Sequence, residues 1–121
     1  MKKIVPLLLC LSTFTSLQAA GCIDEKNTTK EFLATNSKSF DQLMTDSIAI
    51  MHKEMSEREL LKNPDKKFLE MMVAHHQGAV NMALSVLLYS KNKEVRALAQ
   101  NIVATQQGEI QLMKLLTKET P

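Results

Sequence analysis

Apolar residues recur at spacings of three and four along the chain after residue 38. In the first such stretch they are Phe40, Met44, Ile48, Met51 and Met55. This spacing places them on one side of an α-helix. Ser39 is a good N-cap, and Asp41 suits the positive end of the helix dipole. The pattern predicts a helix from residue 39 to about Leu60.

Two more helices are predicted after this one. Asn63 and Pro64 favour a helix start, and the helix should run to about Tyr89. Its apolar stripe comprises Phe68, Met72, Ala79, Ala83 and Val86. A polar turn over residues 90–93 precedes a third helix, from Lys93 to about Leu116. Short connections favour antiparallel neighbours. The sequence therefore predicts an all-α, up-down-up unit of three antiparallel helices, which can close a core alone or dimerise into a larger bundle.

The N-terminus has the pattern of a secretory signal peptide over residues 1–21, with Met-Lys-Lys before a short apolar run. Ala19-Ala20-Gly21-Cys22 resembles a lipobox, although Ala19 stands where Leu is usual. The sequence is compatible with two ways of processing the signal peptide, lipidation of Cys22 and ordinary cleavage after Ala19 or Ala20. Either route predicts an exported, periplasmic protein without a transmembrane segment. Residues 22–38 are polar and predict a tether, and a helical domain is expected over residues 39–118.

Charge and cysteine content exclude several classes of protein. The chain has 15 basic and 13 acidic residues, and the two signal lysines account for the net charge of +2. A balanced remainder argues against nucleic-acid binding. Cys10 leaves with the signal, so Cys22 has no partner for an internal disulfide and no Cys-rich zinc site is possible.

Methionine and histidine side chains cluster at helical spacings. Met72 lies three residues before His75 and four before His76, which brings these side chains together on a helix. The candidate metal ligands from the three helices are His75, His76, Met72, Met82, Met51, His52, Met55 and Met113. Glu109 and Gln106 fall on the apolar side of the third helix. We expect this carboxylate to be buried and compensated by a histidine or a metal on the facing helix. Both residues are expected to hydrogen-bond a histidine that binds the metal, and whether Glu109 also contacts the metal stays open.

Thioether and imidazole donors together favour copper, above all Cu(I). Zinc prefers Cys, His and carboxylates, and a di-iron bundle needs Glu-x-x-His motifs that are absent here. With no placed nucleophile, phosphate loop or paired carboxylates, the residues suit binding and not catalysis. Methionines also fill cores, so two alternatives stay open. One is a non-metal helical envelope adaptor with a buried His/Glu network, and the other a metal-dependent oxidase.

Three motifs carry a family resemblance: Met51-His52-x-x-Met55, Met72-x-x-His75-His76-Gln77-Gly78-Ala79-x-x-Met82-Ala83, and Gln106-x-x-Glu109-Ile110-x-x-Met113. Over residues 40–116 the chain resembles an exported bacterial family of unknown function typified by the periplasmic copper-binding protein CopM. The resemblance implies a ferritin-like helical bundle that binds copper through Met and His, as a chaperone or buffer in copper tolerance. It also implies copper-export or other envelope proteins as partners. Ala74 departs from the family, which often has Pro before the His pair.

Overall fold

The computed structural model describes residues 31–121. It contains three helices, α1 (Phe40–Arg58), α2 (Pro64–Tyr89) and α3 (Lys93–Glu119), and no strand within the described residues. The all-helical prediction and the bounds of α2 are confirmed. Helix α1 stops short of Leu60, and α3 continues beyond Leu116. The expected signal peptide and Cys22 lie outside the described residues.

Each helix begins with a side-chain cap that satisfies free backbone N–H groups. Ser39 and Gln42 form a reciprocal capping box at the start of α1. Asn63 accepts hydrogen bonds from two backbone N–H groups at the start of α2, with Pro64 in the first turn. Asn92 caps α3 by accepting from the N–H of Val95. The first two caps agree with the sequence-based prediction.

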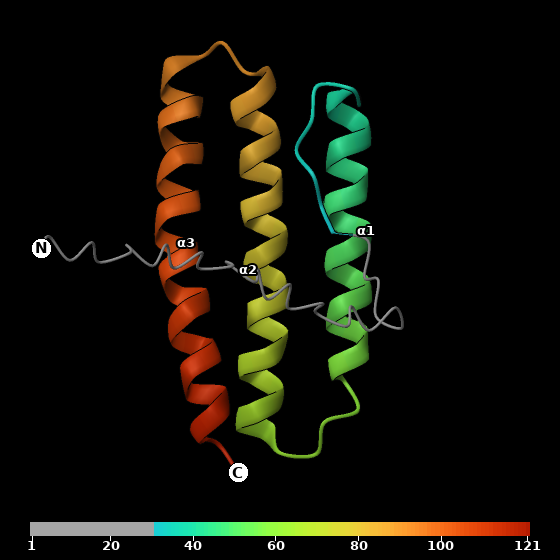
Figure 1. Cartoon of the computed structure of the whole chain (residues 1–121), viewed down its shortest axis with the longest axis vertical. Coiled ribbons are helices and arrows are strands. Elements are labelled where there is room, and N and C mark those ends of the chain that lie inside the picture. Colours follow the sequence, from blue (N-terminus) through green and yellow to red (C-terminus); the bar gives the residue numbers. More distant parts are fainter. Residues whose placement is uncertain (1–30) are drawn as a thin grey trace, which may run out of the picture.

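The three helices lie side by side in a single layer, with α2 in the middle (Figure 1). Helix α2 packs against both α1 and α3, whereas α1 and α3 do not contact each other. The chain therefore does not close a three-helix core. Helix α2 is covered on two opposite flanks and stays open on the two sides between them. These open sides form part of the two broad faces of the layer.

Burial on α2 follows this arrangement. Its buried residues are Ala74, Gly78, Asn81 and Ser85 on the flank toward α1, and Val80 and Ala83 on the flank toward α3. Helix α2 continues without a break through Ala74. On the neighbours, the buried residues are Leu43 and Ser47 of α1 and Ala99 and Ile110 of α3.

The prediction that the apolar stripe of α2 forms the buried core is wrong. Only Ala83 of that stripe is buried, and Phe68 is 61% exposed. The prediction assumed one buried side per helix, as in a closed bundle. In a single layer the middle helix buries its two flanks instead, so the stripe between those flanks faces outward.

Residues 31–39 run beside α1 without forming a helical turn. Lys38 Nζ lies 2.5 Å from Asp46 Oδ2, and the Tyr89 hydroxyl donates to the carbonyl of Lys38. Phe40 and Tyr89 pack edge to face, with ring centroids 5.9 Å apart. None of the helices within residues 31–121 is long and apolar enough to cross a membrane.

A candidate metal centre on the methionine face

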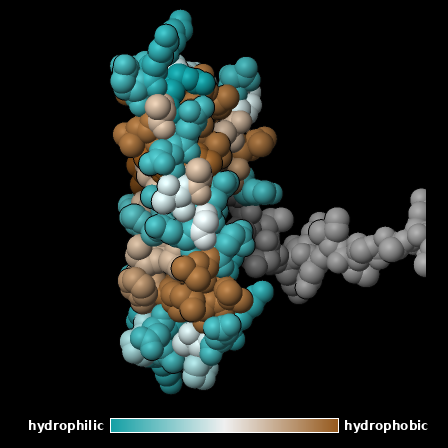
Figure 2. All heavy atoms as spheres, turned by 90° about the vertical axis from the view of Figure 1, so that its left-hand side faces the viewer, coloured by the Kyte–Doolittle hydropathy of each residue, from teal (hydrophilic) through white to brown (hydrophobic). Residues whose placement is uncertain are grey.

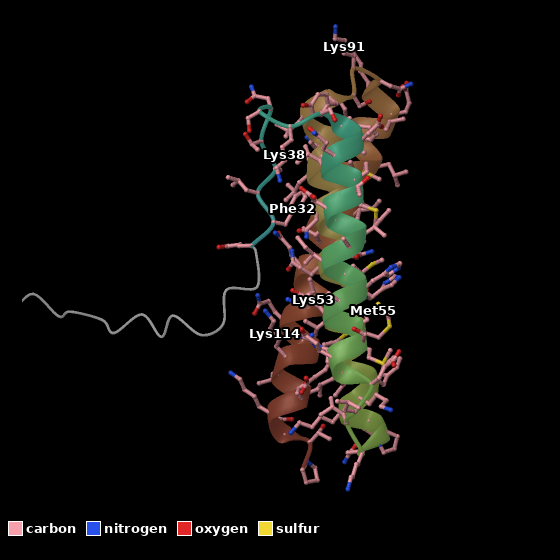
Figure 3. The ribbon with its side chains drawn as sticks, turned by 90° about the vertical axis from the view of Figure 1, so that its right-hand side faces the viewer. Phe32, Lys38, Lys53, Met55, Lys91 and Lys114 are labelled. Carbon is pink, nitrogen blue, oxygen red and sulfur yellow. The ribbon has the colours of Figure 1, made fainter. Side chains whose placement is uncertain are left out.

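The two broad faces of the layer carry different chemistry (Figure 3). Met55 projects from one side of α1 and most sulfur atoms gather along that side, while Lys53, Lys114 and Phe32 lie on the other. Helical periodicity adds the members from α2 and α3 to the sulfur-rich side. We call it the methionine face, and it comprises Met44, Met51, Met55, Met71, Met72, His75, Met82 and Met113. We call the other side the lysine face.

The lysine face is polar by comparison. Its hollow of about 540 Å³ is lined by charged residues of all three helices, among them Arg58, Glu70 and Lys114. Arg58 Nε lies 4.0 Å from Glu70 Oε2 across α1 and α2. Among the described residues no group of three or more His, Cys, Asp or Glu is placed to hold a metal.

Met51 occupies a notch in α2 that exists because residue 78 is glycine. A Cβ built on Gly78 would lie 2.6 Å from Met51 Sδ and 2.8 Å from Met51 Cγ. No side chain fits that space, so the missing Cβ fixes where the Met51 thioether sits. Gly78 follows His75 by three residues, which places the Met51 sulfur on the His75 side of α2.

His76 is held by Glu109 across the seam between α2 and α3. Its Nε2 lies 2.8 Å from Glu109 Oε2, and the His76 side chain is 13% exposed. A carboxylate only accepts hydrogen bonds, so Nε2 carries the proton and donates. The second nitrogen, His76 Nδ1, is buried and has no hydrogen-bond partner. In the neutral imidazole this Nδ1 carries a lone pair.

An imidazole that donates one N–H to a carboxylate and keeps its other nitrogen free has the arrangement of a metal-binding histidine. The carboxylate fixes the tautomer and the orientation of the ring. Gln106 Oε1, one turn before Glu109 on α3, is a second buried polar atom without a hydrogen-bond partner. Two such atoms in one seam are unusual, because buried polar atoms are nearly always paired.

His75 differs from its neighbour. It is exposed at the middle of the methionine face, with its ring centroid 6.0 Å from that of His76 and the two ring planes at 64°. Adjacent residues on a helix point about 100° apart, so His76 turns toward α3 while His75 faces outward. The two rings therefore lie at different places, His75 on the open methionine face and His76 in the seam between α2 and α3.

Glu109 corrects one expectation and fulfils another. The sequence predicted a buried carboxylate in an apolar stripe, but the Glu109 side chain is 53% exposed. It lies at the open side of α3, so solvent lowers the cost of its charge. Its predicted contact with a histidine is confirmed by the bond to His76. Gln106 makes no such bond in this structure.

The remaining candidate ligands, five methionines and His52, lie in two different parts of the structure. Met51, Met55, Met72, Met82 and Met113 are half-buried on the methionine face. His52 is exposed, and helical geometry turns it toward the outer edge of α1, away from α2. The structure therefore does not bring His52 to the other two histidines. Sequence reasoning missed the notch at Gly78; a glycine in the middle of a helix is the signal that a close approach leaves.

Over residues 31–121, fold and site define a small all-helical domain with a sulfur- and imidazole-rich face. Residues 17–117 match the model of a family described as a domain of unknown function (DUF305), and the chain belongs to this family. A search of the curated proteins found no match.

Proposed function

We propose that this protein binds copper, as Cu(I), on its methionine face. The observation that carries the proposal is His76 Nδ1, a buried nitrogen with no hydrogen-bond partner on a ring held by Glu109. Leaving such an atom unpaired costs about 1–3 kcal/mol, and a bound metal would recover that cost. Neighbouring thioethers make a soft ion the best match.

The proposed ligands come from two seams of the layer. In the α2–α3 seam, His76 Nδ1 would bind together with Met72, four residues earlier on α2, and Met113 of α3. In the α1–α2 seam, the proposed donors are Met51 and Met55, with His75 and Met82 beside them on the methionine face. Copper bound by several exchangeable thioethers can pass from one ligand set to another. That property suits a chaperone or a buffer, and not an enzyme.

The cellular setting is part of the proposal. The N-terminal pattern supports export to the periplasm, with either ordinary cleavage or lipidation at Cys22. Copper-export or other envelope proteins would then be its partners in copper tolerance. We also propose that the single layer is part of a ferritin-like bundle, since one layer of helices leaves apolar surface that a second layer normally covers.

A competition titration tests the copper site. The protein would be titrated with Cu(I) against a chromophoric chelator under reducing conditions. His76→Ala should lower the affinity at least about tenfold, because the nitrogen that Glu109 orients is lost. His52→Ala is the matched control, since that exposed ring points to the outer edge of α1, and it should bind as the parent does. Equal chelator competition by His76→Ala and the parent would refute this site.

The open methionine face also favours a second candidate function, a non-metal envelope adaptor. Exposed apolar side chains suit docking of another protein, and the His76–Glu109 bond would then only steady the seam. Thermal unfolding separates the two functions. A ligand at about 100 times its dissociation constant stabilises the folded state by about 2.7 kcal/mol, so copper binding must raise the melting temperature. An adaptor shows no such rise.

A further inference from the structure

The methionine face carries a protrusion at one end and a hollow at the other. Phe68, near the start of α2, is 61% exposed and projects from the outward ridge of the helix. Toward the other end of α2 lies a hollow of about 240 Å³. It is lined by apolar side chains of α2 and α3 that include Ala79, Met82, Val86, Leu98 and Ile102.

The hollow is large enough for the ring of Phe68 from another molecule. Apolar cavities of about 150 Å³ accept benzene, which has the size of a phenylalanine ring. The hollow in the same molecule is out of reach, because Phe68 and Met82 are separated by 14 residues of one helix, about 21 Å. The protrusion and the hollow can therefore meet only between two molecules.

We propose that two copies of this chain pack face to face through their methionine faces, with Phe68 of each copy in the hollow of the other. A two-fold axis produces both contacts at once, as an isologous interface requires. The axis must pass midway between Phe68 and Met82 along α2, and that midpoint is His75. The two copies of α2 would then cross in opposite directions near His75.

The size of the face fits a stable dimer. Helix α2 has 26 residues and is about 39 Å long, and three helices at 8–10 Å spacing span roughly 25 Å. The face thus offers on the order of 1,000 Å², whereas a stable interface buries about 800 Å² on each partner.

Charge also favours this face. From Phe68 to Tyr89 the only charged residue of α2 is Glu70, which lies on the lysine face beside Arg58. Exposed apolar side chains of the two outer helices flank the ridge of α2, namely Ile48, Val95, Leu98 and Leu116. Seen from the α3 side, hydrophobic residues gather in patches along the layer (Figure 2). The lysine face, by contrast, carries charged groups of every helix around its hollow.

The dimer gives His75 a role that one copy cannot supply. Its ring is exposed in a single layer, but near the axis it meets His75 of the partner subunit. If the proposed copper function holds, the second imidazole completes a site shared by the two copies. The dimer itself rests on the shape of the face and does not depend on copper.

Sedimentation equilibrium on the full chain without copper tests the dimer. The parent should be dimeric. Phe68→Glu should raise the dimer dissociation constant at least about a hundredfold, because two such side chains are lost and each is worth about a factor of ten. Leu98→Lys should also weaken the dimer, and the double variant Phe68→Glu/Leu98→Lys should recover much of the loss. Recovery is expected because the new charges face each other across the interface.

Leu115→Glu is the control, since Leu115 is 53% exposed but lines the hollow of the lysine face. It should leave the dimer intact, and circular dichroism should show folded helices in every variant. A monomeric parent, or a dimer weakened equally by Leu115→Glu, would overturn the interface. Copper titration then separates the proposals: copper binding by a monomer contradicts only the dimer, and a dimer without copper binding contradicts only the copper function.

Discussion

The two flanks of α2 hold their donor atoms in different ways. On the flank toward α1 the seam consists of small residues, and Met51 sits where Gly78 has no side chain. On the flank toward α3 the seam buries Val80 and Ala83, and it also contains the hydrogen bond from His76 to Glu109. Steric exclusion positions a sulfur in one seam, and a directional bond positions a nitrogen in the other.

This difference affects how each seam responds to substitution. A sulfur has no strong directional partner, so packing alone can fix it, and packing is sensitive to one methyl group. An imidazole has two distinct nitrogens, so its useful orientation requires a hydrogen bond to one of them. Changes in the first seam should therefore appear mainly as lost stability, and changes in the second mainly as lost metal affinity.

The largest effect is expected from Leu43→Ala in the seam between α1 and α2. Leu43 is 0% exposed, so the substitution leaves a cavity between the helices. It should lower the free energy of unfolding by about 2–5 kcal/mol. Urea denaturation followed by circular dichroism measures this. Leu112→Ala, at an exposed leucine of α3, should stay within about 0.5 kcal/mol of the parent. Equal losses at the two positions would contradict the packing described for α1.

Two helical glycines provide a sharper test. A Cβ at Gly78 meets Met51 at under 3 Å, whereas a Cβ at Gly108 of α3 has nothing within 4 Å. Gly78→Ala should lower the free energy of unfolding by about 1–3 kcal/mol, because the new methyl group forces the seam apart. Gly108→Ala should raise it by about 0.5–1 kcal/mol, the usual gain in a helix. Thermal unfolding of both variants tests these opposite changes in stability. If Gly78→Ala instead stabilises the protein, the position of Met51 does not depend on the missing Cβ at residue 78.

The sequence predicted each element but not how the elements share their buried surface. Helix starts at Ser39 and Asn63 were readable because caps act locally. Which residues of α2 are buried depends on two neighbouring helices, and a periodic pattern identifies only one apolar side. The clustering of Met72 with the histidines followed from helical spacing. The free Nδ1 of His76 did not, because it depends on a contact with α3.

The smallest expected effect on stability is that of Glu109→Ala in the seam between α2 and α3. The carboxylate is half exposed, so its bond to His76 should contribute less than about 1 kcal/mol to folding. Its effect on copper should be larger. Without Glu109 the His76 ring is free to turn, and the affinity for Cu(I) should fall about 10–100-fold. Competition titration and urea denaturation of the same preparation measure both quantities. Glu70→Ala, on the lysine face, is the matched control and should leave copper affinity unchanged. A Glu109→Ala variant that keeps its copper affinity would show that this carboxylate does not orient the ligand.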